Sequence, residues 1–135
     1  MAFRILEHTA DVRLLVEGRT LEELFREALR GMMEVLKAEK KEGGLESTRK
    51  IEIEAASPTP LLVDFLNEAL WLAHTHREAF SQVVFGAISE TRVDATLRGF
   101  SAQAFGEDIK AVTYHEAEIR RNAAGNLETM LVFDI

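Results

Sequence analysis

The apolar positions of the chain follow a period of two in some segments and a helical period in others. The period of two predicts strands at Phe3–Glu7, Val12–Gly18, Ile51–Ala55, Val83–Ser89, Arg92–Phe100, Tyr114–Arg120 and Glu128–Ile135. The helical spacing predicts one helix that begins after Thr20 and ends within Lys37–Glu42, and a second that begins at Thr59-Pro60 and fades at His74-Thr75-His76.

Local signals support the predicted helix starts. Thr20 followed by Glu23 fits a capping box. Thr59 is a plausible N-cap, since the missing N–H of Pro60 costs nothing at the first helical position. The segment Lys37–Arg49 carries no apolar stripe and contains two adjacent glycines, so it is expected to be a solvated loop.

The predicted order is ββαβαββββ, with few helices and mostly adjacent strands. We therefore expect an α+β fold: a largely antiparallel β-sheet with two helices packed on one face. No linker, internal repeat or low-complexity tract interrupts the 135 residues. This length predicts a single domain, 1–135.

Composition narrows the classes of function. The 16 basic and 23 acidic residues give a net charge of −7, and phosphate affinity requires clustered Lys and Arg, so strong direct nucleic-acid binding is not expected. Apolar runs are too short to span a bilayer, and the first residues do not resemble a secretory signal. Without cysteine there is no disulfide or thiolate site. We expect a cytoplasmic protein that does not bind membranes.

Sequence motifs of common enzymes are absent, and the histidines do not form a zinc pattern. No P-loop, G-x-G-x-x-G or G-x-S-x-G occurs. His74 and His76 do not share a helical face, and cations at a helix C-terminus suit its dipole. His8 and His115, taken singly, are more often structural than catalytic.

Carboxylates offer a more specific hypothesis. Asp11 stands where a strand begins, Asp134 is the penultimate residue, and the terminal carboxylate of Ile135 follows it. If these groups met, each pair at about 5 Å would repel by roughly 3 kcal/mol at an effective dielectric near 20, and a divalent cation would relieve the repulsion. The alternative is a turn residue and a solvated chain end. Spacing alone favours this alternative, because it does not show that positions 11 and 134 meet.

A second polar group is formed by Lys110, Tyr114 and His115. These side chains fall within six residues and could line a site. A surface lysine beside a tyrosine at a strand start explains the same pattern, and the residues alone favour that explanation.

Four segments, in this order, resemble the archease family over essentially the whole chain: His8-Thr9-Ala10-Asp11, Leu62-Val63-Asp64-Phe65-Leu66-Asn67-Glu68, Lys110-Ala111-Val112-Thr113-Tyr114-His115 and Val132-Phe133-Asp134-Ile135. The resemblance implies a small α+β protein that assists the GTP-dependent tRNA-splicing RNA ligase. It would promote guanylylation of the active-site histidine of the ligase and allow multiple turnover, without joining RNA itself.

The resemblance also implies site residues. By position, Asp11, Asp134 and Ile135 would hold a divalent metal ion, with Ca²⁺ expected in crystals and Mg²⁺ or Mn²⁺ as alternatives. Lys110 becomes a candidate functional side chain, with His115 beside it. Two other functions stay open: a chaperone of an RNA methyltransferase, and a stand-alone metal-dependent phosphoesterase.

The sequence departs from the family pattern near these segments. Glu7 stands where the family usually has Asp, Arg13 where a Gly is common, and Phe105–Ile109 is abbreviated and lacks a His. These departures leave the three expected ligands in place, but they bear on how the neighbouring loop meets a partner.

Overall fold

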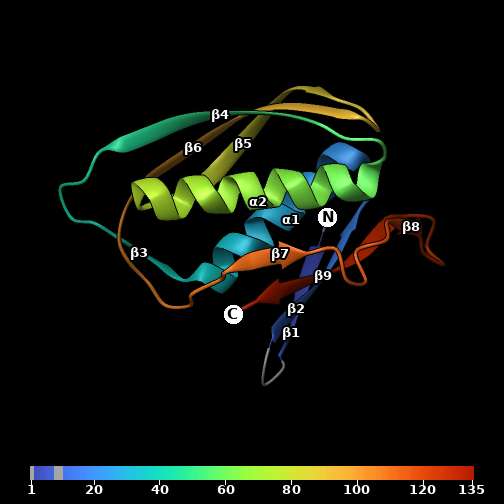
Figure 1. Ribbon diagram of the computed structural model, residues 1–135, viewed down its shortest axis with the longest axis horizontal. Helices are drawn as coiled ribbons and strands as arrows, with labels where there is room; N and C mark the ends of the chain where they lie inside the picture. The colour runs from blue at the N-terminus through green and yellow to red at the C-terminus, as the bar shows by residue number, and fades with distance from the viewer. Residues whose placement is uncertain (1, 8–10) are drawn as a thin grey trace.

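The computed structural model describes residues 2–7 and 11–135 (Figure 1). In chain order, its elements are β1 (Ala2–Glu7), β2 (Asp11–Gly18), α1 (Leu21–Leu36), β3 (Ala38–Lys40), β4 (Glu46–Glu54), α2 (Pro58–His76), β5 (Glu78–Ile88), β6 (Arg92–Phe105), β7 (Ala111–Thr113), β8 (Arg120–Arg121) and β9 (Leu127–Asp134).

The strands form two antiparallel sheets. The first has the order β1-β2-β9-β7, and β8 also pairs with β9. In the second, β6 is the central strand and pairs with β3, β4 and β5. Both chain ends contribute to the first sheet, because β9 lies directly against β2.

The two helices lie between the sheets (Figure 1). Helix α1 packs mainly on β2 and also on β5, whereas α2 packs on β4, β5 and β7. The ring of Phe65 on α2 packs at a tilt against Phe25 of α1 and Phe85 of β5, with ring centroids 5.6 and 6.0 Å apart respectively. Both helices therefore supply the core that the sheets share.

The predicted α+β class with antiparallel strands and two helices is confirmed, although the strands divide between two sheets. Helix α1 begins where predicted, since the hydroxyl of Thr20 accepts from the N–H of Glu23 at 3.1 Å. Helix α2 begins earlier than predicted: its N-cap is Ser57. The Thr59 hydroxyl instead accepts a hydrogen bond from the N–H of Ile119.

Two other predictions are wrong in part. The expected loop over Lys37–Arg49 contains β3 and the start of β4, whose alternation of exposed and half-buried residues has too few apolar members to be noticed. Of the expected strand Tyr114–Arg120, only Arg120 lies in a strand, the short β8: the backbone leaves the sheet after Thr113, and Glu116 has a positive φ of 61°. Contacts with α2 and β2 hold this segment instead of a strand partner.

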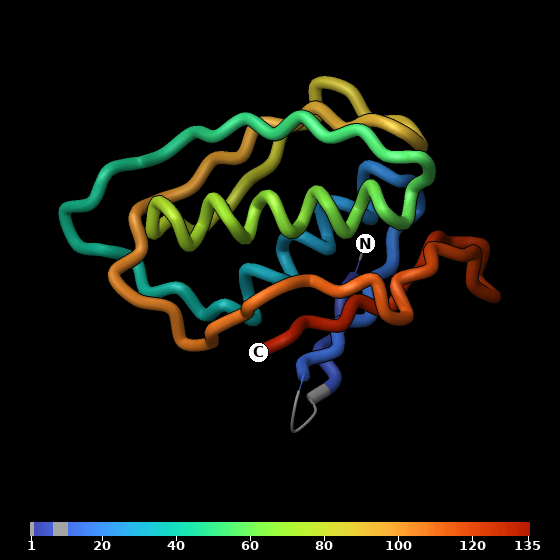
Figure 2. The backbone as a smooth tube through the Cα atoms, viewed as in Figure 1, coloured from blue at the N-terminus to red at the C-terminus, as the bar shows by residue number. Residues whose placement is uncertain are grey.

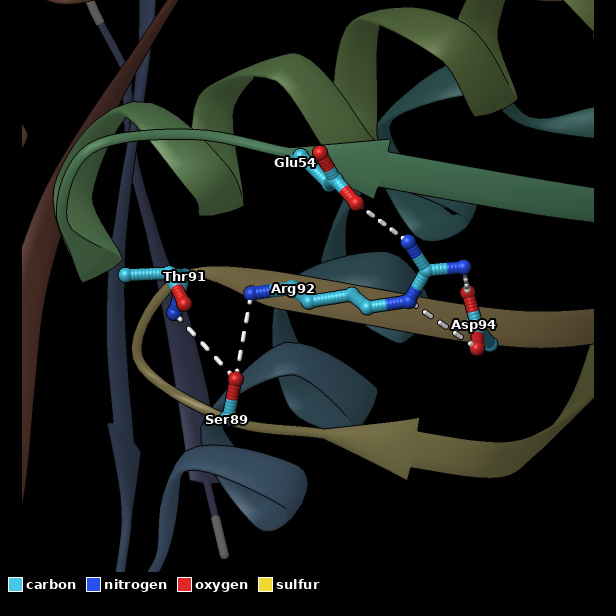
Figure 3. Close-up of polar contacts among 5 residues, drawn as sticks. All are labelled: Glu54, Ser89, Thr91, Arg92 and Asp94. Atoms are coloured by element: carbon cyan, nitrogen blue, oxygen red, sulfur yellow. Dashed lines mark hydrogen bonds and ion pairs between the residues drawn. The ribbon is translucent and has the colours of Figure 1, made fainter.

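The turn between β5 and β6 is closed by side chains (Figure 3). The hydroxyl of Ser89 accepts hydrogen bonds from the N–H groups of Thr91 and Arg92. The guanidinium of Arg92 then joins Glu54 on β4 to Asp94 on β6, so its pKa is raised, chiefly by the hydrogen bond to Asp94. These contacts fix the end of the second sheet.

Within the described residues, no helix combines the length and the apolar character that crossing a membrane would require.

Candidate functional site

The two aspartates that the sequence analysis selected lie opposite one another. Asp11 on β2 is the cross-strand partner of Asp134 on β9. Directly paired residues of antiparallel strands point to the same face, with Cβ atoms about 4.5–5.5 Å apart. This is the face away from α1, because Val12 and Phe133, the next pair in the register, are buried in the core.

Strand β7 lies on the other side of β9 from β2. Ala111 pairs with Asp134 from the other side, and the N–H of Lys110 donates to the Asp134 carbonyl at 2.7 Å. The end of the chain therefore runs between β2 and β7, as Figure 2 shows. Ile135, half-buried, packs against the core. These bonds give the last residues a fixed position beside Asp11.

An amide side chain of α2 fixes the outer edge of β7. The Asn67 side chain donates to the Val112 carbonyl and accepts from the Val112 N–H, both at 2.8 Å. This pair of hydrogen bonds reproduces what a neighbouring strand would provide. About two helical turns further along α2, Nε2 of His74 lies 3.0 Å from the carbonyl oxygen of Ile109. Helix α2 thus holds the backbone on both sides of Lys110.

The segment that follows β7 is attached by side chains. The Tyr114 hydroxyl donates to Oδ1 of Asp64, and this hydrogen bond, helped by burial, raises the pKa of Tyr114 above its ordinary value of 10.0. Arg13 of β2 forms an ion pair with Glu116. Segment 114–119 is therefore tied to α2 at both ends, through Asp64 and Thr59, and to the first sheet through Arg13.

The remaining predicted site residues are on the surface. Lys110 and His115 are both exposed, and the backbone N–H of His115 donates to the Thr113 hydroxyl at 3.3 Å. Residues 8–10 of the first motif lie outside the described residues. Among the residues that are described, no three His, Asp or Glu side chains gather closely enough to hold a metal. A cation at Asp11 and Asp134 would need main-chain oxygens such as the Ile135 carboxylate.

The polar contacts of α2 differ from those that its sequence predicts. The sequence predicts Thr59 as a cap and His74 as a partner of the helix dipole, whereas both side chains bind the backbone of segment 109–119. Asn67 entered only through the family resemblance. Asn67 and His74 stand about two helical turns apart, but α2 also carries polar residues such as Asp64 and Glu68, so nothing in the helix distinguishes this pair.

The four segments noted in the sequence thus meet in one region: β2 pairs with β9, β9 with β7, and β7 with α2. The fold and this region define a small α+β protein with an acidic pair at a sheet end. Its sequence matches the Archease protein family (MTH1598/TM1083) over residues 3–135, and the chain belongs to this family.

Individual relatives cover nearly the whole chain. Protein archease of Methanosarcina barkeri is 33% identical, over 98% of this chain and 95% of its own length. Protein archease of Pyrococcus abyssi is 30% identical, over 96% and 95% respectively. These matches leave no large part of the chain outside the family.

Solved structures share the fold. The solution structure of Methanobacterium thermoautotrophicum protein 1598 has a TM-score of 0.68 with 25% identity, and covers 98% of both chains. The crystal structure of a Thermotoga maritima archease, described as a possible chaperone, has a TM-score of 0.64 with 21% identity and covers 98% of this chain and 96% of its own. This second likeness concerns the fold alone.

Proposed function

We propose that this protein is a metal-binding accessory protein that activates the GTP-dependent tRNA-splicing RNA ligase. It promotes guanylylation of the ligase's active-site histidine and multiple turnover, and it works in the cytoplasm. Membership of the archease family supports the proposal. The observation that carries it is the register of Asp11 with Asp134, which brings two carboxylates together beside the last residue.

The donor set fits a hard divalent cation. Asp11, Asp134 and the Ile135 carboxylate would hold the ion, since oxygen ligands suit Ca²⁺, Mg²⁺ and Mn²⁺. When bound, the cation would supply positive charge that can neutralise phosphoryl oxygens during guanylyl transfer. The protein's own contribution is positional: β7 and Asn67 hold the Asp134 strand, and Lys110 adds a cationic side chain at the edge.

The negative net charge of the protein is consistent with a positively charged protein partner. The net charge of −7 suits a ligase with a basic RNA groove, because complementary fields speed the encounter of two proteins. A second candidate is a chaperone role, as described for the Thermotoga maritima relative, with an RNA methyltransferase as the client. In that case the acidic pair is a structural feature only.

The test compares purified variants with the ligase, GTP and metal. Asp134→Asn should bind Mn²⁺ at least about tenfold more weakly in calorimetry, because one anionic ligand is lost, and should lose the acceleration of guanylylation. Glu52→Gln is the matched control: it removes one exposed carboxylate from the second sheet and should keep both properties. Adding one alanine after Ile135 should weaken metal binding in the same way as Asp134→Asn.

Three results would contradict the proposal. If Asp11→Asn accelerated guanylylation of the ligase as much as the unchanged protein does, activation would not depend on the metal. Lower thermal stability without metal, combined with intact activation, would favour a structural ion and the chaperone role. Turnover of simple phosphoesters by the protein alone would instead indicate a hydrolase.

A further inference from the structure

The chain has one tryptophan and one tyrosine, and both are on the surface. Trp71 is 57% exposed and Tyr114 is 58% exposed, whereas the largest fully buried aromatic side chains are phenylalanines. Tryptophan and tyrosine at the surface are the residue types that most often dominate binding energy at protein interfaces. Their position therefore indicates a contact surface.

Both rings belong to one face of the molecule. Asp64, Glu68 and Trp71 follow one another at helical spacing along α2, and Tyr114 joins them through its hydrogen bond to Asp64. Trp71 stands seven positions after Asp64, which corresponds to roughly 10 Å along the helix axis. Figure 1 shows α2 at the front of the molecule, with the segment containing β7 running beside it.

The charge of this face is negative around the rings. Glu68 is half-buried and forms no ion pair with any residue of the described ranges, and Asp64 accepts only a neutral phenol among the contacts found there. The His76 ring meets Trp71 edge-on, at 6.3 Å and 82°. Carboxylates beside an aromatic ring bind a guanidinium well, since it pairs with the oxygens and stacks on the ring.

We propose that this α2 face, formed by Asp64, Glu68, Trp71 and Tyr114, is the docking surface for an arginine-bearing segment of the partner protein. The surface continues into the candidate metal site, because Asn67 on α2 binds Val112 and the adjacent Ala111 pairs with Asp134. A partner seated on α2 is thereby placed next to the acidic pair. The inference rests on the proposed function for the identity of the partner.

Binding to the purified RNA ligase tests the surface. Trp71→Ala should weaken binding at least about tenfold, and Glu68→Arg should weaken it and reduce its dependence on salt. Val84→Ala is the control, since Val84 is 54% exposed on β5 and should change binding less than about twofold. The metal affinity of all three variants should equal that of the unchanged protein.

Labelling with 5-fluorotryptophan provides a direct signal, because the single tryptophan gives one ¹⁹F resonance. This resonance should shift when ligase is added. Unchanged ligase binding by both Trp71→Ala and Glu68→Arg overturns the inference. Self-association that Trp71→Ala abolishes, or a resonance shift caused by RNA alone, assigns the face to another occupant and also overturns it. Failure of the unchanged protein to bind or activate the ligase overturns the proposed function itself.

Discussion

At the residue scale, Tyr114 shows how one hydrogen bond links the candidate site to pH. Its hydroxyl donates to Asp64, and the pKa of the phenol is raised, first by this bond and then by burial. A proton held more tightly in the folded state stabilises that state below the unfolded pKa, near 10.0, and the contribution disappears as pH rises through the folded pKa.

Tyr114→Phe removes this proton and gives a testable difference. Near pH 7.5 the variant should be less stable by about 0.5–1 kcal/mol, the usual contribution of one partly exposed hydrogen bond. The difference in unfolding free energy should shrink at a second, alkaline pH well above 10.0, because the raised pKa of Tyr114 in the folded protein is then passed and the proton is lost. Urea denaturation at both pH values measures it, and a difference that grows with pH contradicts the assignment of the proton.

At the scale of elements, the hairpin of β5 and β6 depends on a close approach of two strands. Gly99 of β6 faces the backbone of β5 at a register shift between Phe80 and Gln82. A Cβ atom at Gly99 would lie 1.8 Å from the Ala79 carbonyl oxygen, which no real contact permits. A Cβ atom at Gly86, in the other strand of the same hairpin, would lie 3.8 Å from its nearest neighbour, the carbonyl oxygen of Asp94.

The pair of glycines predicts opposite effects of the same substitution. Gly99→Ala should destabilise the protein by about 3 kcal/mol or more, since the added methyl forces the strands apart. Gly86→Ala should be neutral or slightly stabilising, by roughly 0.5 kcal/mol, because alanine loses less backbone entropy on folding. Thermal unfolding followed by circular dichroism distinguishes them; equal losses for both variants would refute the steric explanation.

Elements with a clear period were predictable from the sequence, and those held by side chains were not. Helix α1 followed from its apolar stripe and from Thr20, because local capping decides its start. The period of two predicts a strand over Tyr114–Arg120, but the structure has none over residues 114–119. The conformation of this segment is instead determined by Asp64 and Arg13, which are distant in sequence. The same holds for the true start of α2, where the hydroxyl of Thr59 serves Ile119 rather than the helix.

At the scale of the whole molecule, the two sheets depend on a single layer of helices. Phe65 is fully buried and contacts Phe25 and Phe85, which belong to the other helix and to the second sheet. The first sheet packs on α1 through β1, β2 and β9, and on α2 through β7. The sheets are therefore expected to unfold together.

Phe65→Ala tests this coupling. The substitution should cost about 3–5 kcal/mol through lost burial and a cavity. Trp71 fluorescence, which reports on α2, and far-ultraviolet circular dichroism, which reports on all elements, should give the same single transition. Two separate transitions would show that the sheets are stabilised independently.

The candidate site could be predicted only in part, since it depends on the register between the two ends of the chain. Sequence reasoning selected Asp11 and Asp134 but could not place them together. That they are partners follows from the pairing of β2 with β9 along their whole length. The contribution of Asn67 could not be derived, because nothing in its own segment indicates that Val112 lies next to it.

The pair of hydrogen bonds between the Asn67 side chain and the Val112 backbone has a consequence for solubility. Strand β7 is the last of its sheet, and an uncovered border strand is a template on which foreign chains polymerise. Here the Asn67 carboxamide occupies the N–H and the carbonyl oxygen of Val112, the two groups to which an incoming strand would hydrogen-bond. The residue that positions the Val112 backbone therefore also disfavours edge-to-edge pairing of β7 with another chain.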